Sequence, residues 1–264
     1  MLRRIVERMP SNSALKVCVL ACSKGAEVYS IAWAIRSARP DLDLTIHAVD
    51  ISEEIIEFAR CGIYSLSEID TTAEKDSGAS REVIRRNTAR DQNESMFERM
   101  SSEEFAALFL IDKDRARIRP ALQRGIHWIC GNAADPCLRS AIGPQDIVFA
   151  NRFLCHMQPA AATDSLRNIA SLVAPGGLLF VSGIDLDVRT QAARDGGWTP
   201  KAELIREIHD GDASIRRGWP VEYWGLEPFD ERRPDWPLRY ASVFQIGEPA
   251  SILEEEASAQ PVAQ

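Results

Sequence analysis

Three polar segments of the sequence carry side chains that could do chemistry, and each directly follows a run of apolar residues. They are 22–27 (CSKGAE), Asp50 and 151–157 (NRFLCHM). Ligands of open α/β sheets bind at the carboxyl ends of the strands, so polar residues at these positions are informative. An aspartate there can accept hydrogen bonds from both hydroxyls of a ribose. A structural alternative is that Asp50 helps to cap the helix that begins near Ser52.

The first segment contains a single glycine, Gly25. The spacing G-x-G-x-x-G, which lets a backbone approach a pyrophosphate, does not occur in this turn, and the sequence has no P-loop lysine motif. A pyrophosphate therefore has no evident binding site in this turn.

The cysteines give little support to a metal site. They form no paired C-x-x-C motifs and have no nearby histidine partners at the spacing of a zinc site. Several fall in apolar runs, where a reduced cysteine behaves as a small hydrophobic residue. The six positions are 18, 22, 61, 130, 137 and 155. We expect no metal.

Strands and helices alternate along most of the chain, which predicts an α/β fold. Short apolar runs predict strands at 16–21, 44–49, 126–131, 146–151 and 178–184. Helical spacing predicts helices at 26–38, 54–60 and 159–173, and the second of these has Ser52 as its N-cap and Gly62 at its end. Such a pattern is typical of a mostly parallel sheet whose strands are joined by helices.

Other segments depart from this alternation. Residues 65–125 are expected to be an insertion or small subdomain, with a hairpin within 109–122. A helix near 201–216 precedes two strands, 221–229 and 239–247, that have no helix between them. They are therefore expected to form an antiparallel hairpin at the edge of the sheet. We expect one domain over 1–247 and a disordered acidic tail over 248–264.

Composition restricts the class of protein further. The chain has 264 residues, of which 45% are hydrophobic and 27% charged, as in an ordinary globular domain. Its formal net charge of −8 argues against a nucleic-acid partner. The sequence has no apolar segment of about 20 residues and no apolar signal sequence, so we expect no membrane insertion and a cytoplasmic location.

A ribose-binding acid, the lack of a phosphate cradle and a closing antiparallel hairpin together describe one kind of sheet. It is the Rossmann-like sheet of the class I S-adenosylmethionine-dependent methyltransferases. Their cofactor carries a nucleoside and an amino acid but no phosphate.

Several segments resemble one family within this class. Residues 22–30 (CSKGAEVYS) resemble the CSTGEEPYS turn of the chemotaxis-receptor glutamate methyltransferases, the CheR family, and 59–65 (ARCGIYS) resemble their ARxGIY segment. Residues 146–154 (DIVFANRFL) are similar to the family's FDxIFCRNVL strand, and 96–132 resemble its small β-subdomain and the asparagine that follows it. Pro175-Gly176-Gly177 completes a resemblance that covers about 14–185.

This resemblance implies a set of binding residues for S-adenosylmethionine. The first turn lines the methionine end of the cofactor, with the carboxylate of Glu27 near the ammonium group, and Asp50 binds the ribose. The implied set is Ser23, Lys24, Gly25 and Glu27 from the turn, Asp50, Asn132 and Ala133 beside the adenine, and Asn151 or Arg152 at the methionine portion.

The sequence also departs from the family pattern. The family's Arg-Asn order is Asn151-Arg152 here, a family tyrosine is His156, and Ala26 and Val28 replace a glutamate and a proline. The family's N-terminal helical domain with its ETxFFR motif does not occur in this sequence, which begins about fifteen residues before the first predicted strand. Either the chain is part of a longer protein or the substrate is not a receptor helix.

The resemblance implies transfer of a methyl group to a carboxylate, by family default a protein glutamate. A carboxylate with a pKa of about 4.3 is already ionised at pH 7 and needs no general base. Arg152 could orient such an acid, and His156, a residue type that titrates near neutrality, is either a base or a wall of the pocket. The alternatives are methylation of an oxygen or nitrogen of a small molecule, and a non-catalytic cofactor-binding module.

The C-terminal part of the chain is rich in tryptophan. These residues could form an acceptor pocket, although aromatic residues near a hairpin more often belong to a core. They are Trp198, Trp219, Trp224 and Trp236.

Overall fold

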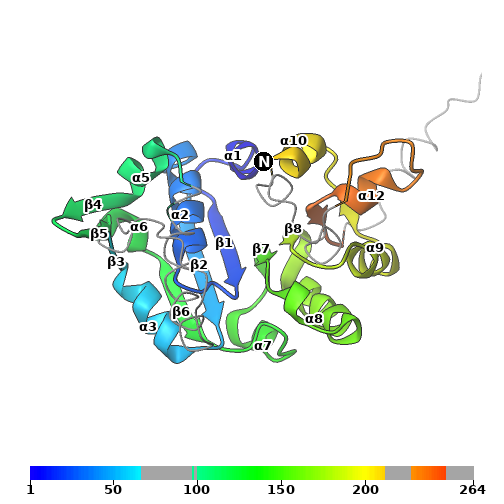
Figure 1. Ribbon diagram of the computed structural model, residues 1–264, viewed down its shortest axis with the longest axis horizontal. Coiled ribbons are helices and arrows are strands. Elements are labelled where there is room, and N and C mark those ends of the chain that lie inside the picture. Colours follow the sequence, from blue (N-terminus) through cyan, green and yellow to red (C-terminus); the bar gives the residue numbers. More distant parts are fainter. Residues whose placement is uncertain (67–96, 98–99, 212–226, 248–264) are drawn as a thin grey trace, which may run out of the picture. The chain divides into compact units, whose positions relative to one another are not determined.

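The computed structural model describes residues 1–66, 97, 100–211 and 227–247 (Figure 1). Seven strands form one sheet in the order β6-β2-β1-β7-β8-β10-β9. Strand β7 is parallel to β1 and β8, and β2 is parallel to β6, whereas β10 is antiparallel to both β8 and β9. The expected fold class, a mostly parallel α/β sheet with antiparallel strands at its C-terminal end, is confirmed.

The chain divides into two compact units, 1–15 with 22–131 and 16–21 with 132–264. Strand β1 (Ala14–Leu20) contains residues of both. The other elements of the first unit are α1 (Leu2–Glu7), α2 (Ala26–Ala38), β2 (Asp43–Asp50), α3 (Glu53–Cys61), β3 (Ile63–Ser65), α5 (Ser102–Leu108), β4 (Phe109–Asp112), β5 (Arg115–Ile118), α6 (Pro120–Gln123) and β6 (Ile126–Cys130).

The second unit contains the remaining elements of the main sheet and its helices. They are α7 (Leu138–Ile142), β7 (Gln145–Asn151), the 3-10 helix η1 (Leu154–His156), α8 (Pro159–Leu172), β8 (Val173–Ser182), α9 (Leu186–Asp195), β9 (Thr199–Pro200), α10 (Ile205–Asp210), α12 (Trp236–Tyr240) and β10 (Val243–Gln245).

Helices α2 and α3 form where the sequence predicts them. In α2, Val28, Ile31, Ala32 and Ile35 are buried at helical spacing. Helix α3 begins after Ser52, whose hydroxyl accepts a hydrogen bond from the backbone N–H of Ile55 over 3.3 Å, and it ends at Gly62 in the left-handed conformation.

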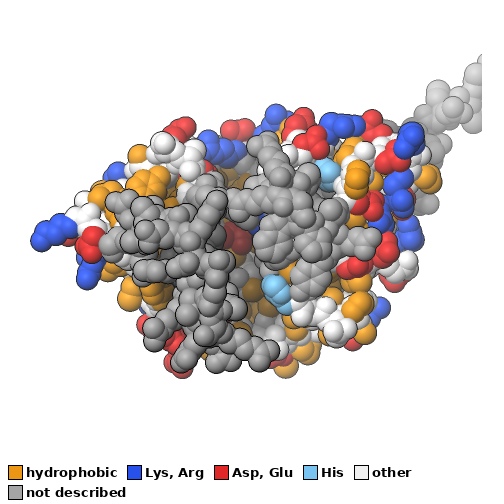
Figure 2. Space-filling view, in the orientation of Figure 1, with side chains coloured by type: hydrophobic (Ala, Val, Ile, Leu, Met, Phe, Trp, Pro, Cys, Tyr) orange, Lys and Arg blue, Asp and Glu red, His pale blue; other side chains and the backbone are white. Residues whose placement is uncertain are grey.

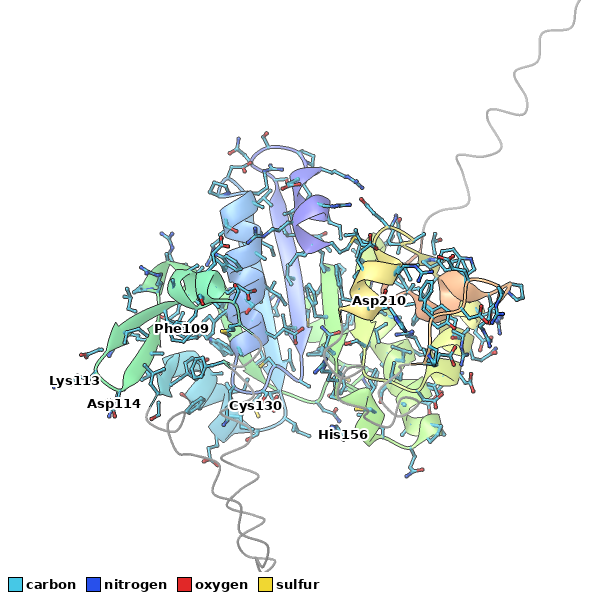
Figure 3. All side chains as sticks on the ribbon, turned by 45° about the horizontal axis from the view of Figure 1, so that its top comes forward. Phe109, Lys113, Asp114, Cys130, His156 and Asp210 are labelled. Atoms are coloured by element: carbon cyan, nitrogen blue, oxygen red, sulfur yellow. The ribbon has the colours of Figure 1, made fainter. Side chains whose placement is uncertain are left out.

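The predicted hairpin within 109–122 is confirmed as strands β4 and β5, and β3 adds a third strand to it. Its tip, Lys113–Asp114, is labelled in Figure 3. The small sheet has its own core, in which Tyr64 contacts Phe109 edge to face with ring centres 5.7 Å apart. The buried Tyr29 of α2 belongs to the same cluster.

The predicted C-terminal hairpin is wrong in its pairing. Strand β10 lies within 239–247 but pairs with β8 and with the short β9, and residues 239–240 belong to helix α12. Residues 227–229 are not a strand, and 221–226 lie outside the described residues. Burial explains the choice, because Phe244 is fully buried between these strands and packs against Trp198.

Three further differences concern helices and the start of a strand. The helix predicted at 201–216 is the shorter α10 in its described part, while residues 212–216 are not described. Helix α9 was not predicted, because its charged sequence has a weak apolar pattern, but the Asp185 carboxylate caps it by accepting from two backbone N–H groups. Strand β8 begins at Val173, five residues earlier than predicted.

Cys18, Cys22 and Cys155 are buried as expected, whereas Cys61, Cys130 and Cys137 are exposed. Basic and acidic side chains are interspersed around the rim of the face shown in Figure 2. Among the helices that the structure describes, none combines the length and apolarity needed to cross a membrane.

We expect Gly62→Ala to destabilise the protein more than Gly197→Ala. Both glycines have left-handed backbones, with φ of 59° and 61°, so alanine meets a similar backbone cost of about 1–2 kcal/mol at each. A Cβ on Gly62 would lie 3.0 Å from the Tyr29 hydroxyl and 3.2 Å from Ile118 Cβ, whereas one on Gly197 meets nothing within 4 Å. Denaturant unfolding should give an additional loss of about 1–3 kcal/mol for Gly62→Ala. Equal losses would contradict this packing.

Candidate functional site

The turn after β1 is shaped by two left-handed residues of the first unit, Ser23 with φ 46° and Gly25 with φ 83°. The N–H of Gly25 donates to the Cys22 carbonyl over 3.0 Å. A Cβ on Gly25 would lie 2.9 Å from the Trp128 ring and 3.1 Å from Ala59 Cβ. The one glycine of this turn is therefore required both by its backbone conformation and by its close packing.

Asp50 holds this turn in place from the end of β2. The residue is 8% exposed, and its Oδ2 accepts a hydrogen bond from the N–H of Ser23 over 2.8 Å. The other oxygen, Oδ1, accepts from the N–H of Ser52 over 3.1 Å. One carboxylate therefore joins the turn after β1 to the residue that caps α3.

The alternative that Asp50 helps to cap the helix beginning near Ser52 is thus partly right. Ser52 provides the side-chain cap of α3, and Asp50 orients Ser52 rather than capping the helix itself. Each carboxylate oxygen has a second lone pair, so these two hydrogen bonds leave capacity to accept donors from a ligand.

Two buried tyrosines donate hydrogen bonds to neighbouring segments, Tyr64 to the turn and Tyr29 to α3. The Tyr64 hydroxyl donates to the carbonyl of Lys24 over 2.7 Å, and the Tyr29 hydroxyl donates to that of Ala59 over 2.7 Å. Burial raises the pKa of Tyr29 to about 12 and raises the pKa of Tyr64 well above its usual value. Both phenols stay protonated and act as hydrogen-bond donors.

An apolar surface beside Asp50 was not predicted from the sequence. Ile51 is 74% exposed, and Phe58 of α3 is 39% exposed, with the Lys24 ammonium 5.8 Å from its ring centre. An exposed isoleucine directly after a strand-terminal acid offers an apolar contact for an aromatic base. The sequence shows an isoleucine directly after Asp50, but the exposure of its side chain depends on the fold.

Cys22 does not supply a nucleophile in this turn. Burial, together with the nearby Asp50 charge, raises the pKa of the Cys22 thiol to about 12. The thiol therefore stays neutral near pH 7 and packs as a small apolar group.

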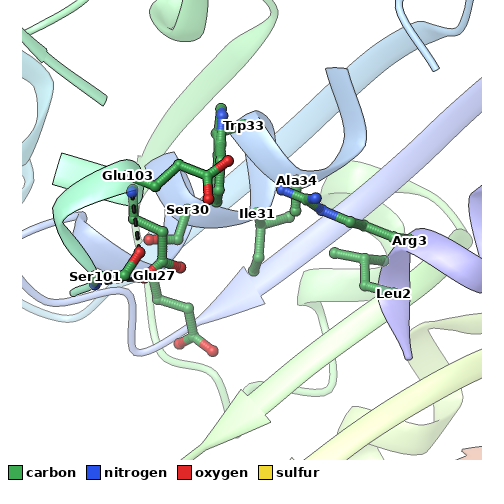
Figure 4. A pocket seen from close by; sticks show the side chains of 10 residues that line it. Leu2, Arg3, Glu27, Ser30, Ile31, Trp33, Ala34, Ser101 and Glu103 are labelled. Atoms are coloured by element: carbon green, nitrogen blue, oxygen red, sulfur yellow. Dashed lines mark hydrogen bonds between the residues drawn. The ribbon is translucent and has the colours of Figure 1, made fainter. Parts of the chain in front are cut away.

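Glu27 lies in the first turn of α2 and is half-buried. It lines an open groove of the first unit whose other walls are residues of α1, of α2 and of the segment that begins α5 (Figure 4). Glu27 therefore lies two residues after the turn held by Asp50, and it borders a groove that is open to solvent.

In the second unit, Asn151 is the last residue of β7 and Arg152 follows it, so both lie at the predicted end of this strand. The Ser182 hydroxyl donates to Oδ1 of Asn151 over 2.8 Å, and the N–H of Arg152 donates to the Ser182 carbonyl over 2.9 Å. Arg152 has a left-handed backbone with φ 61°, and a Cβ on Gly183 would lie 2.7 Å from its Cα. The end of β8 therefore fixes the turn after β7.

The remaining candidates of the second unit lie on turns and short helices. His156 is an exposed residue of η1 (Figure 3). Asn132 and Ala133 follow β6, and the side-chain oxygen of Asn132 accepts from the N–H of Ala134 over 2.9 Å. The oxygen of Asn132 is thus used within its own turn.

The tryptophan-rich pocket is not supported where the structure describes it. Trp198 is 7% exposed and packs on Phe244, so it belongs to the core. Trp236 packs on Phe229 with ring centres 5.9 Å apart. Trp219 and Trp224 lie outside the described residues.

Comparisons with known proteins find similarity to methyltransferases. Residues 1–79 match the family model described as "CheR methyltransferase, SAM binding domain". A relative from Pseudomonas aeruginosa, "Probable biofilm formation methyltransferase WspC", is 26% identical over 81% of this chain and 45% of its own length. A "Chemotaxis protein methyltransferase" from Vibrio parahaemolyticus is 24% identical over 73% of this chain and 58% of its own length.

The chain thus spans about half the length of these relatives. An O-methyltransferase family protein from Burkholderia thailandensis overlaps 76% of this chain and 51% of its own, with 14% identity and a TM-score of 0.40. The fold assignment rests on the strand order rather than on this overlap. The match of residues 1–79 and these two relatives make the chain similar to the CheR methyltransferases.

Proposed function

We propose that this protein transfers a methyl group from S-adenosylmethionine to a carboxylate, and that the acceptor is a glutamate side chain of a protein. The observation that carries the proposal is the turn 22–25 held by the Asp50 carboxylate at the end of β2. The matched family model and the resemblance to glutamate methyltransferases favour this acceptor.

The residues of the first unit fit a nucleoside with an amino-acid tail. Asp50 offers carboxylate lone pairs suited to ribose hydroxyls, and the exposed Ile51 offers an apolar surface to a base. Gly25 leaves the backbone of the turn free of a Cβ. The turn has no second glycine to cradle a pyrophosphate, which suits a ligand without phosphates.

We assign the remaining contacts by the same resemblance. Ser23, Lys24 and Glu27 hold the methionine end, with the Glu27 carboxylate paired to the ammonium group. Asn132 and Ala133 flank the adenine, and Asn151 or Arg152 contacts the methionine portion. Arg152 orients the acceptor through a charge-assisted hydrogen bond. When bound, S-adenosylmethionine supplies a methyl group activated by a positively charged sulfur.

The chemistry of a carboxylate acceptor makes few demands on the protein. The ionised oxygen bonds to the methyl carbon as the carbon–sulfur bond breaks, so the negative carboxylate and the positive sulfonium are both neutralised. The products are a methyl ester and S-adenosylhomocysteine. Because the acceptor is already ionised near pH 7, the protein has to position it and exclude water, and no side chain has to remove a proton.

Transfer of a labelled methyl group tests this function. The purified protein is incubated with methyl-labelled S-adenosylmethionine and cell extract, and protein is separated from small molecules. We expect label in protein that mild base releases as methanol, because methyl esters hydrolyse readily. Label confined to small molecules, or label in protein that resists base, would contradict a protein carboxylate as the acceptor. Transfer to no acceptor would favour the non-catalytic alternative.

We expect His156→Phe to lower turnover on the labelled acceptor by less than about tenfold. A carboxylate gives up no proton, so His156 acts as a wall of the pocket, whereas positioned acid–base catalysis contributes about a hundredfold or more. The matched control is His127→Phe, which changes an exposed histidine of β6. A loss of about a thousandfold with unchanged affinity for S-adenosylhomocysteine would make His156 a base and the acceptor an alcohol, phenol or amine.

A further inference from the structure

The first unit has an open groove of about 520 Å³ between α1, α2 and the start of α5 (Figure 4). Its volume falls in the usual range for ligand sites, about 300–1,000 Å³. Its lining combines an aromatic face, short aliphatic side chains and several charges. The argument below uses Arg3 of α1, Glu27 and Trp33 of α2, and Glu103 and Glu104 of α5.

The wall formed by α1 is held firmly against α2. The Arg39 guanidinium, at the end of α2, donates hydrogen bonds of 2.8–3.0 Å to three carbonyls at the end of α1, those of Val6, Met9 and Pro10. Val6 itself is fully buried. The groove is therefore a built feature of this unit.

Trp33 gives the groove a face that suits a cation. One part of its indole packs against the small apolar core of the first unit. The guanidinium carbon of Arg3 lies 4.6 Å from the ring centre, and Figure 4 shows this side chain reaching from α1 toward α2. A planar guanidinium over an indole is a favourable cation–π arrangement. The groove thus already holds, within its own chain, the kind of group that such a face binds.

The charge of the groove favours a positively charged occupant as well. Among the lining residues that the structure describes, three carboxylates, those of Glu27, Glu103 and Glu104, accompany one cation, Arg3. Glu104 uses one oxygen to accept from the N–H of Ser101 over 2.9 Å in the capping box of α5. Among these described residues, negative side chains therefore outnumber positive ones.

A metal ion does not explain this set. Among the residues that the structure describes, no three His, Cys, Asp or Glu side chains are grouped closely enough to hold one. An organic cation fits both the indole face and the carboxylates of the groove. A guanidinium can stack on the indole while its N–H groups donate to a carboxylate. The openness of the groove suits a side chain presented by an extended segment.

We propose that this groove binds an arginine side chain in a basic segment of a partner protein, and that Arg3 occupies the Trp33 face when the partner is absent. The proposal deepens the proposed function, because a protein acceptor needs a docking contact apart from its reactive carboxylate. It is measured as binding without methyl transfer, so its failure is distinct from failure of that function.

The test uses the full chain and the peptide acetyl-Gly-Arg-Gly-Arg-Gly-amide, with binding measured by calorimetry at low and moderate salt. Peptides that carry citrulline or lysine in place of arginine are the matched probes. We expect the arginine peptide to bind about tenfold or more tightly than the neutral citrulline peptide, with lysine between them. Equal binding of the citrulline peptide, or binding of none of the three, would overturn the proposal.

Variants locate the binding in the groove. Glu103→Gln should weaken binding of the arginine peptide at least threefold. The control Glu53→Gln, which alters an exposed first-turn glutamate of α3, should leave this affinity unchanged. Arg3→Ala should strengthen binding severalfold, because it vacates the indole face. Trp33→Leu should remove the preference for arginine over lysine. If Glu103→Gln matches its control, or if Arg3→Ala weakens binding, the peptide binds elsewhere. Because Glu27 also belongs to the proposed cofactor site, saturating S-adenosylhomocysteine should weaken peptide binding by less than about threefold, and full competition would place the peptide in the cofactor site instead.

Discussion

The structure of the first unit depends on one carboxylate. Asp50 ends β2 and accepts the N–H of Ser23 with one oxygen and that of Ser52 with the other. Hydrogen bonds from backbone N–H groups to an ionised acceptor are among the strong ones, and here they fix both neighbouring segments. The left-handed turn and the start of α3 are thereby set by the same side chain that we propose binds the ribose.

This arrangement explains how one glycine suffices where phosphate-binding turns use several. A phosphate needs a row of free backbone N–H groups, whereas here the N–H of Ser23 is already directed to Asp50 and that of Gly25 to Cys22. The turn presents side chains and a carboxylate to its ligand. A ligand with hydroxyl and ammonium donors suits such a surface, and the buried Tyr64 phenol holds the turn by donating to the Lys24 carbonyl.

Much of this could be predicted from local sequence. Helical spacing and caps located α2 and α3, because Ser52 and Gly62 act within a few residues of their own positions. The position of Asp50 followed from the end of an apolar run. The hydrogen bond from Ser23 to Asp50 could not be predicted, since it joins residues 27 apart in the chain.

The predictions that were wrong or incomplete share one physical cause. Strand β10 was expected to pair with its neighbour in sequence, but burial of Phe244 directs it to β8 and β9. Ile51 was overlooked because an isoleucine is usually buried and only the fold leaves this one exposed. Tryptophans suggested a pocket, yet Trp198 fills a core. Residue type alone does not separate an apolar contact surface from a packed interior.

The central claim is that the carboxylate of Asp50 both shapes the turn and binds the ribose. Calorimetry can test it with S-adenosylhomocysteine and its 2′-deoxyribose analogue, on the native chain and on Asp50→Asn. The control Asp146→Asn changes a carboxylate that likewise accepts a backbone N–H, that of Lys16 over 2.7 Å, but at the start of β7. We expect the native chain and the control to bind the deoxy analogue about ten- to a hundredfold more weakly, and Asp50→Asn to bind both ligands equally. Discrimination that persists in Asp50→Asn, or that is lacking in the native chain, would contradict the account.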